Sequence, residues 1–379
     1  MNTATITLHT AHNNGSFLQA YALQKTINKM GYSNKIINFV PMAQYALYQN
    51  IIFKELSAKG IIKGMLNVPN YLALKKRKDR FNGALDNLNL TSKFDNEDDF
   101  ASISEDFDCL IAGSDQIWNN ASMPDFSKLY LLPVNKYKIS YAPSFGKSLK
   151  NQFGSEILNQ ISQFDYLSVR EQSVKQELDN LLPNKEVKVV LDPTFLLDKE
   201  EYAELSRNAN CKYNGDYIFF YCIKATNDVL KTVKEISKIL NMPVVTVFTG
   251  VNTYKCQVFG QKIDFQAGPA EFLQYVQNAK YVISNSFHGV VFSIIYNKTF
   301  FRIADNEDGK IKIDERLDSI LNMLGLSVQN VITNSSISLN TDIDYAVANE
   351  KMSDLRNGSL GWLQEALSDI QIKVDEKKN

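Results

Sequence analysis

The chain is poor in the residue types that most often bind transition metals, with three histidines and four cysteines among 379 residues. The cysteines, Cys109, Cys211, Cys222 and Cys256, form neither a Cys-X-X-Cys pair nor a cluster with histidine. Such spacing is typical of reduced, mostly buried thiols in a cytoplasmic protein and argues against a zinc site. We therefore expect no bound metal.

Several other signals are missing as well. There is no apolar run approaching the roughly 20 residues of a membrane span, and the start, Met1–Thr7, lacks the basic and apolar parts of a signal peptide. The chain contains no Walker A lysine motif, no GxGxxG fingerprint and no GxSxG elbow. These absences argue against nucleotide hydrolysis, a classical dinucleotide site and a serine-hydrolase triad. We expect a soluble, cytoplasmic protein.

The composition is that of an ordinary globular protein. Hydrophobic residues make up 44% and charged residues 22%, and the formal net charge is −1. This balance gives no general attraction to nucleic acid, so we expect no nucleic-acid partner. The length suggests about two domains.

Apolar runs that resemble buried strands alternate with segments of helical period along most of the chain. Residues 4–8 predict a strand, residues 16–30 a helix that ends at Gly31, and residues 35–39 a second strand. The same alternation continues to the run at 187–191 and starts again at 217–221. It predicts an α/β protein with two Rossmann-like lobes facing across a cleft.

The predicted boundary between the lobes lies near Asp192-Pro193. We assign residues 1–194 to the N-terminal lobe, with a basic helical insertion at about 42–82, and residues 195–379 to the C-terminal lobe, which ends in a long helix from Tyr345 to about Ile372. Between residues 50 and 82, lysines and arginines outnumber acids by eight to two. This block is either a solvated helix face or an amphipathic surface for an anionic membrane or a lipid-phosphate-linked substrate. The sequence leaves the oligomeric state open.

Chemically useful residues stand where predicted strands end. They are found in the loop Asn13-Asn14-Gly15, at Asp115 with Gln116, at Arg170, and at His288. In open α/β sheets, ligands bind at the carboxyl ends of strands and beside helix N-termini.

Each of these positions also has a structural interpretation. Asp115 could cap the following helix, Arg170 could form a salt bridge with Glu171 or a neighbour, and His288 could cap a buried helix. The functional interpretation of Arg170 is a planar fork that binds a carboxylate or a phosphate.

Six motifs together resemble the polysaccharide pyruvyl transferase family, in the same order from about residue 5 to residue 325. They are Asn14-Gly15-Ser-Phe-Leu-Gln19-Ala-Tyr-Ala-Leu23, Ala112-Gly-Ser114-Asp115-Gln116-Ile-Trp118, Ile139-Ser-Tyr-Ala-Pro-Ser-Phe-Gly146, Ser168-Val-Arg170-Glu171, Leu191-Asp192-Pro193-Thr194 and Ser286-Phe-His288-Gly289.

The resemblance implies a fold of the glycosyltransferase-B kind. It also implies transfer of pyruvate from phosphoenolpyruvate, as a ketal, to a sugar of a bacterial surface polysaccharide or its lipid-linked precursor. Phosphoenolpyruvate is then the donor substrate, and neither a metal nor an organic cofactor is needed.

The resemblance assigns donor binding to Arg170 and matches His288 to the family's histidine, which could supply or relay a proton near neutral pH. Chemistry, rather than the resemblance, suggests Asp115 as the acceptor of a sugar hydroxyl proton. The other residues expected to bind substrate lie in the same motifs. They are Asn14, Gly15, Gln19, Ser114, Gln116, Asn285, Ser286 and Gly289.

The last motif departs from the family pattern, because Ser286 stands where the family often has an arginine that also contacts the donor. The site could then hold less positive charge or use Arg302, Arg316 or Lys310 from nearby loops instead. Two other functions stay open: a glycosyltransferase that uses a nucleotide-sugar donor, and a non-catalytic binding subunit of a polysaccharide assembly complex.

Overall fold

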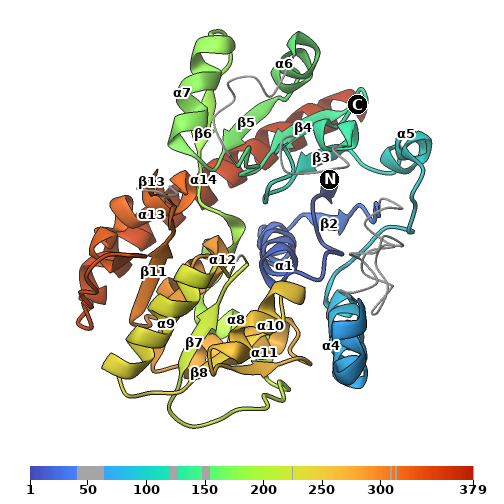
Figure 1. The fold of residues 1–379 in the computed structure, drawn as a ribbon. Helices are drawn as coiled ribbons and strands as arrows, with labels where there is room; N and C mark the ends of the chain where they lie inside the picture. The colour runs from blue at the N-terminus through green and yellow to red at the C-terminus, as the bar shows by residue number, and fades with distance from the viewer. Residues whose placement is uncertain are drawn as a thin grey trace.

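A computed structural model of the chain describes residues 1–40, 64–119, 127–146, 154–223, 225–307, 310–311 and 314–378. Two six-stranded sheets, each covered by helices on both faces, form the framework of this part (Figure 1). The α/β fold predicted from the sequence is confirmed. Of the predicted insertion at 42–82, residues 42–63 lie outside the described part of the chain.

The first sheet is parallel throughout and has the order β2-β1-β3-β4-β5-β6. Its strands are β1 (Asn2–Ile6), β2 (Ser33–Ile36), β3 (Cys109–Ala112), β4 (Tyr137–Ser140), β5 (Tyr166–Val169) and β6 (Val187–Val189). All four residues of the central strand β3 are buried, as expected for a parallel strand covered on both faces.

The second sheet is also parallel, in the order β14-β11-β10-β7-β8-β9. Its strands are β7 (Ile218–Tyr221), β8 (Val244–Val247), β9 (Lys262–Asp264), β10 (Tyr281–Ser284), β11 (Phe300–Ala304) and β14 (Asn330–Ile332). A two-stranded antiparallel hairpin of β12 (Asn306–Glu307) and β13 (Lys310–Ile311) follows β11.

Helices surround both sheets. Those of the first half are α1 (Asn14–Lys29), α4 (Tyr71–Ala84), α5 (Phe100–Ser104), α6 (Ser155–Ser162) and α7 (Gln172–Leu181). Those of the second half are α8 (Lys199–Ser206), α9 (Asn227–Ile239), α10 (Tyr254–Val258), α11 (Pro269–Asn278), α12 (Phe287–Ile295), α13 (Glu315–Leu324) and α14 (Tyr345–Lys378). No helix of the described residues is both long enough and apolar enough to cross a membrane.

Helix α1 joins the two lobes. Phe17, Leu18 and Tyr21 pack into the same apolar cluster as Phe272 of α11 and Phe292 of α12. The following turns, with Leu23 and Ile27, instead pack against strands of the first sheet. Because α1 is covered from both sides, its amphipathic character is weak and nearly every residue from Asn14 to Ile27 is buried.

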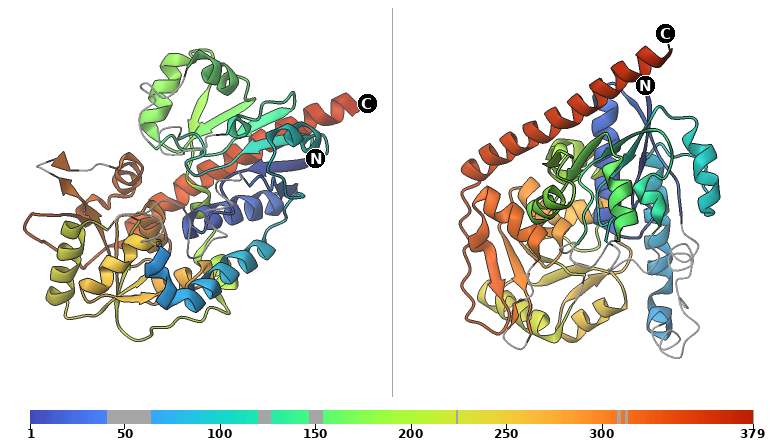
Figure 2. Two further views of the ribbon diagram at one scale, coloured as in Figure 1. Left: turned by 45° about the vertical axis from the view of Figure 1, so that its right-hand side comes forward. Right: turned by 90° about the horizontal axis from the view of Figure 1, so that it is seen from above.

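The C-terminal helix α14 also crosses between the lobes, which corrects its assignment to the second lobe alone. Ala348 and Met352 pack in the core of the second lobe. Leu363, Leu367 and Ile370 pack against α1 and the first sheet. Figures 1 and 2 show the helix running from the second lobe along the whole width of the first. A helix of 34 residues is about 50 Å long, which is long enough for both contacts.

Helix α4 belongs to the basic block, and one face of it is buried. Leu74 and Phe81 are 5% and 4% exposed, and Arg77 between them is 9% exposed. Leu74 joins an apolar cluster of the second lobe, and Arg80 donates to Gln266 O at 3.0 Å and lies 3.4 Å from Glu271. The basic block is therefore neither a wholly solvated face nor confined to the first lobe.

Candidate active site

The strand orders locate one ligand-binding edge on each sheet. In the first sheet, successive strands are added to one side of β1 and then, from β3 onward, to its other side. In the second sheet the same change of side occurs between β7 and β10. Ligands of open α/β sheets bind at such switch points, outside the carboxyl ends of the strands. The loop before Gly15, the turn at Asp115 and the segment before His288 follow β1, β3 and β10, so the sequence-predicted residues lie at these two edges.

Asp192 is the centre of the polar contacts between the lobes. Its side chain is fully buried, and Oδ2 accepts from Arg170 Nη1 at 2.6 Å and from Ser114 Oγ at 3.1 Å. The same oxygen lies 3.8 Å from Nε2 of His288 in the second lobe. Oδ1 accepts from the amide and the hydroxyl of Thr194 at 3.1 and 2.7 Å. One carboxylate therefore brings together the predicted donor-binding arginine and the predicted proton donor.

Arg170 keeps unused hydrogen-bonding capacity although it is buried. Nε lies 3.6 Å from Glu171 Oε1, beyond hydrogen-bond distance, and Nε and Nη2 have no hydrogen-bond partner among the described residues. Its guanidinium carbon lies 4.4 Å from the ring centroid of Phe287, at the start of α12. The salt bridges expected from the structural interpretation exist, yet they leave two donors free. Buried donors without protein partners are costly, so a ligand oxygen that accepts from them would offset this cost.

The two carboxyl groups beside Arg170 differ in their pKa values. Burial alone would raise the pKa of Asp192, but the imidazole of His288, whose Nε2 lies 3.8 Å away, the charge of Arg170 and the Thr194 bonds together hold it well below its usual range. Burial raises the pKa of Glu171, and Arg170 and the Ser144 hydroxyl only partly oppose this. Asp192 is therefore the carboxylate that stays ionised, whereas Glu171 holds a proton more readily.

His288 enters the site at the second position of α12, next to the helix N-terminus. The residue is 8% exposed, and Nε2 has no hydrogen-bond partner among the described residues. The ring packs against Gly15 of the other lobe: a Cβ added to Gly15 would lie 2.0 Å from His288 Nδ1. Glycine at this position is what allows the histidine to reach the first lobe. His288 does not cap the helix, since Ser286 is the N-cap residue.

Asp115 is held on the first lobe next to α1. Oδ2 accepts from Ser16 Oγ at 2.5 Å, and Oδ1 accepts from the backbone amide of Gln116 at 2.9 Å. Its φ of +69° belongs to the left-handed region, which aspartate tolerates better than most residues. The residues that follow, up to 119, form turns, so Asp115 caps no helix there and that interpretation is wrong.

The three cations considered as substitutes for an arginine at 286 have different positions. Arg302 forms a salt bridge with Asp318 at 3.0 Å and donates to Asn330 at the same distance. The side chain of Lys310 lies outside what the structure describes. Arg316 pairs with Asp314, and its guanidinium carbon lies 5.6 Å from the Phe287 ring that Arg170 also contacts. Arg316 is thus the cation that shares the surroundings of Arg170.

A cavity of about 190 Å³ lies between the lobes at this point. Arg170 and Asp192 line it from the first lobe, Phe287 and Arg316 from the second, and Leu355 and Ser359 of α14 close one side. The cavity combines two arginines with apolar walls, which suits a small organic anion.

Two of the residues predicted to bind substrate have a role in holding the fold together. Gln19 is fully buried, and its amide donates to Thr7 Oγ1, Leu8 O and Ser16 O, which holds the loop after β1. A Cβ on Gly289 would lie 2.2 Å from Ser284 Oγ, so this glycine lets α12 approach β10. Substrate contact by either residue stays a prediction.

The other predicted residues lie around the loops of the two edges. Ser286 is buried and its amide donates to Ser284 Oγ at 3.0 Å, while Asn285 accepts from the amide of Ile223 at 3.3 Å. Gln116 accepts from Asn119 at 2.6 Å. Asn14 is buried and its Oδ1 has no hydrogen-bond partner among the described residues. Asn14 is therefore the best placed of these four to meet a polar ligand.

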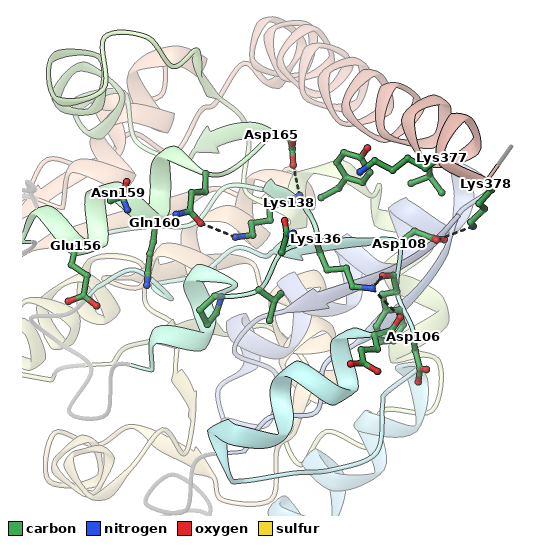
Figure 3. A pocket seen from close by; sticks show the side chains of 18 residues that line it. Asp106, Asp108, Lys136, Lys138, Glu156, Asn159, Gln160, Asp165, Lys377 and Lys378 are labelled. Carbon is green, nitrogen blue, oxygen red and sulfur yellow. Dashed lines mark hydrogen bonds and ion pairs between the residues drawn. The ribbon is translucent and has the colours of Figure 1, made fainter.

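A larger pocket of about 920 Å³ lies on the first lobe, beside the C-terminal end of α14 (Figure 3). Its lining residues come from the start of β4 and from the segments around Asp106, Glu156 and Lys377. It lies at the N-terminal edge of the first sheet, opposite the switch point. Its lysines have partners: Lys136 donates to two backbone carbonyls, and Lys378 pairs with Asp108. Size alone does not make it the candidate site.

Sequence reasoning gave no site role to Asp192, although it named this residue as part of a motif and as a domain boundary. It also left Glu171 as a mere salt-bridge partner. An Asp-Pro pair directly after a buried strand was the available signal for Asp192. The local sequence did not show that Asp192 contacts Arg170, 22 positions earlier, and lies close to His288, 96 positions later.

Comparison with solved structures identifies the fold. The UDP-GlcNAc 2-epimerase of Neisseria meningitidis bound to UDP-GlcNAc is 11% identical, with 98% of this chain and all of that chain covered and a TM-score of 0.51. The UDP-GlcNAc 2-epimerase of Methanocaldococcus jannaschii (13% identity, 94% and 99% coverage, TM-score 0.49) and the E. coli heptosyltransferase WaaC with ADP (9%, 94% and 100%, 0.41) are also similar. At these identities the likeness concerns the fold alone, and the match to the Neisseria meningitidis epimerase agrees with the two-lobed, glycosyltransferase-B-like fold expected from the sequence.

A search among curated proteins found no similar sequence. The family model of polysaccharide pyruvyl transferase matches residues 13–307. The match spans more than half of the chain and contains α1, Asp115, Arg170, Asp192 and His288. This protein therefore belongs to the polysaccharide pyruvyl transferase family.

Proposed function

We propose that this protein transfers the pyruvyl group of phosphoenolpyruvate to two hydroxyls of a saccharide, either in a surface polysaccharide or in its lipid-linked precursor, and releases phosphate. The observation that carries the proposal is the pair of unused donors on buried Arg170 beside His288, at a cavity between the lobes. Membership of the family supports the same reaction class.

The cavity suits the donor in charge and in size. Phosphoenolpyruvate carries a carboxylate and a phosphate, and a guanidinium with two free N–H groups can bind either of them in a bidentate manner. Arg316 adds a second positive charge, and the N-terminus of α12 adds backbone N–H groups. At about 190 Å³ the cavity is smaller than a typical drug-sized site and fits a three-carbon donor.

The proposed chemistry begins with a proton transfer from His288 to the methylene carbon of phosphoenolpyruvate. That carbon becomes a methyl group and C2 becomes cation-like. One sugar hydroxyl adds to C2 and loses its proton, for which Asp115 is the proposed base. The C2–O bond to phosphate then breaks and phosphate leaves with the bonding electrons. The second hydroxyl adds to C2 and loses its proton to the now neutral His288, which restores the acid and completes the ketal.

The remaining side chains position these groups. Asp192 keeps its charge and holds Arg170 and Ser114 from one side and His288 from the other. Ser16 fixes the carboxylate of Asp115. Acids and bases are sufficient for every step, so we propose a reaction without a metal or an organic cofactor. We also propose that it occurs in the cytoplasm, where phosphoenolpyruvate is made.

The test is phosphate release from phosphoenolpyruvate by the purified full chain, with and without lipid-linked saccharide extract. We expect release only when saccharide is present. In heavy water, the ketal methyl group should carry one deuterium, because the added proton comes through an exchangeable group. No binding of phosphoenolpyruvate by calorimetry and no phosphate release with any extract would refute the donor assignment.

The same preparation separates the alternatives. Thermal stabilisation by UDP- or GDP-sugars but not by phosphoenolpyruvate would indicate a nucleotide-sugar glycosyltransferase. Full saccharide pyruvylation in a His288→Ala strain would remove His288 from the mechanism and favour a non-catalytic binding subunit.

A further inference from the structure

An exposed apolar surface lies directly before and on the first turn of α4. Its members are Met65, Leu66, Val68, Tyr71 and Leu72, all of which are exposed, with Leu72 at 79% and Met65 at 61%. We call these five residues, together with the exposed Lys75 and Lys76, the α4 surface. Five large apolar side chains exposed within eight residues are far more than the scattered single ones of an ordinary surface.

The backbone of this segment is anchored, so the exposure is not that of a loose end. Asn67 is buried and accepts from Tyr254 of α10 at 3.1 Å. Leu74 and Phe81 are buried on the inner face of α4, at helical spacing. The segment has thus already packed against its own protein. The side chains of the α4 surface are exposed, and α4 lies at the edge of the molecule (Figures 1 and 2).

The charges beside the apolar side chains favour one kind of partner. Residues 64–78 contain four basic residues and no acidic one. Apolar side chains with flanking lysines are the combination that binds the interface of an anionic bilayer. A two-fold dimer through this surface would bring lysines of both copies together, which disfavours a second copy as the partner.

The α4 surface is also connected to the candidate site. Arg77 Nη2 donates to the carbonyl of His12 at 2.8 Å, and the ring of Phe81 stacks on His12 at 5.1 Å. His12 precedes Asn13, the N-cap of α1, and Gly15 of the same turn contacts His288. The inner face of α4 therefore supports the loop before α1, which leads to the predicted substrate-binding residues Asn14 and Gly15, while its outer face is exposed.

We propose that the α4 surface docks this protein on an anionic lipid bilayer, so that the cleft meets a saccharide carried by a membrane lipid. The docking itself is independent of the reaction. Only the lipid-linked nature of the acceptor rests on the proposed function.

The test is flotation of the full chain with vesicles of phosphatidylglycerol and phosphatidylcholine, compared with vesicles of phosphatidylcholine alone. We expect binding to the anionic vesicles. Val68→Ser with Leu72→Ser should weaken it about tenfold or more, and Lys75→Gln with Lys76→Gln about tenfold at low salt. Matched controls on α9 are Ile239→Ser, 59% exposed in the parent, and Lys234→Gln with Lys238→Gln. These controls should bind like the parent, and unchanged thermal melts should show that every variant is folded.

The proposal is overturned if the parent does not bind anionic vesicles, or if the α4 variants bind as well as the α9 controls. It is also overturned if the parent is a dimer by sedimentation and Leu72→Ser makes it monomeric, which would assign the surface to a second copy.

Turnover separates the two proposals: α4 variants should process a soluble saccharide fragment like the parent and a vesicle-borne acceptor more slowly. The two proposals can also fail separately. If the parent turns over no phosphoenolpyruvate but the α4 variants still lose vesicle binding, the docking proposal stands and the proposed reaction is refuted.

Discussion

The larger and the smaller pocket of this molecule differ most in how their polar groups are paired. The pocket at the N-terminal edge of the first sheet measures about 920 Å³, and the cavity between the lobes about 190 Å³. In the larger one, Lys136 and Lys378 have partners at 3.0–3.1 Å. In the smaller one, Arg170 is buried, and its Nε and Nη2 have no hydrogen-bond partner among the described residues. The same holds for Nε2 of His288, which lies 3.8 Å from the cavity residue Asp192.

This difference shows that unpaired buried donors are better evidence for a binding site than volume. A wide, wet pocket costs the protein little, because water satisfies its polar groups. A buried guanidinium with free N–H groups costs stability that a bound anion would recover. The following substitutions test this comparison, and Lys138→Met in the larger pocket serves as a control for the effects on turnover.

His288→Gln should have the largest effect. Glutamine keeps a polar side chain of similar length but cannot donate a proton as an acid, so the turnover number should fall by about a thousandfold. Saccharide-dependent phosphate release measures it. Lys138→Met should leave this rate within about twofold, because Lys138 lines the larger pocket at the N-terminal edge of the first sheet, opposite the candidate site. Equal losses in both variants would remove the distinction between the two pockets.

Asp192→Asn should lower the free energy of unfolding at neutral pH by about 3 kcal/mol, because Arg170 then loses its buried ionised partner. The pKa of Asp192 is lower in the folded protein than in the unfolded chain. Its contribution is therefore present above the unfolded pKa of about 4 and is lost as the pH falls below that value. Urea unfolding at several acidic pH values should show a smaller loss of stability on acidification in the variant. Parallel curves for parent and variant would contradict the assigned ionisation.

Arg170→Lys should weaken phosphoenolpyruvate binding by about thirtyfold, because an ammonium group cannot form the bidentate hydrogen bonds of a planar guanidinium. Arg316→Gln should weaken it by about fivefold, as the loss of one neighbouring charge. Calorimetric titration with phosphoenolpyruvate measures both. A larger loss for Arg316 than for Arg170 would reverse their proposed roles.

Gly15→Ala should lower turnover less than the loss of His288 itself. The new methyl group would have to displace the His288 ring, which lies 2.0 Å from the position of the added Cβ. We expect the turnover number to fall about tenfold through misplacement of the ring, with little change in donor affinity. Gly154→Ala is the matched control, because its Cβ would meet no atom within 4 Å. Identical kinetics for the two variants would show that the ring position is unimportant.

The secondary structure of this protein was largely predictable because its signals are local. The run at 217–221 agrees with β7 to within one residue, and the helix predicted at 16–30 agrees with α1 to within two. Short elements were missed: β9 has three residues, too few to show a period. The family resemblance and the position of His288 between a strand and a helix were likewise visible in the motifs alone.

Tertiary structure alone decided how the distant parts meet. The sequence by itself determined that Asp192 ends a strand segment and that Arg316 belongs to a nearby loop or helix, but not that both lie next to Arg170. These contacts join residues far apart along the chain, and they depend on how α1 and α14 pack the two lobes together. Local periodicity reports which face of an element is buried, whereas the partner of that face depends on packing across the whole chain. For that reason a catalytic role for His288 could be proposed from the sequence, whereas the charges that surround it could not be predicted.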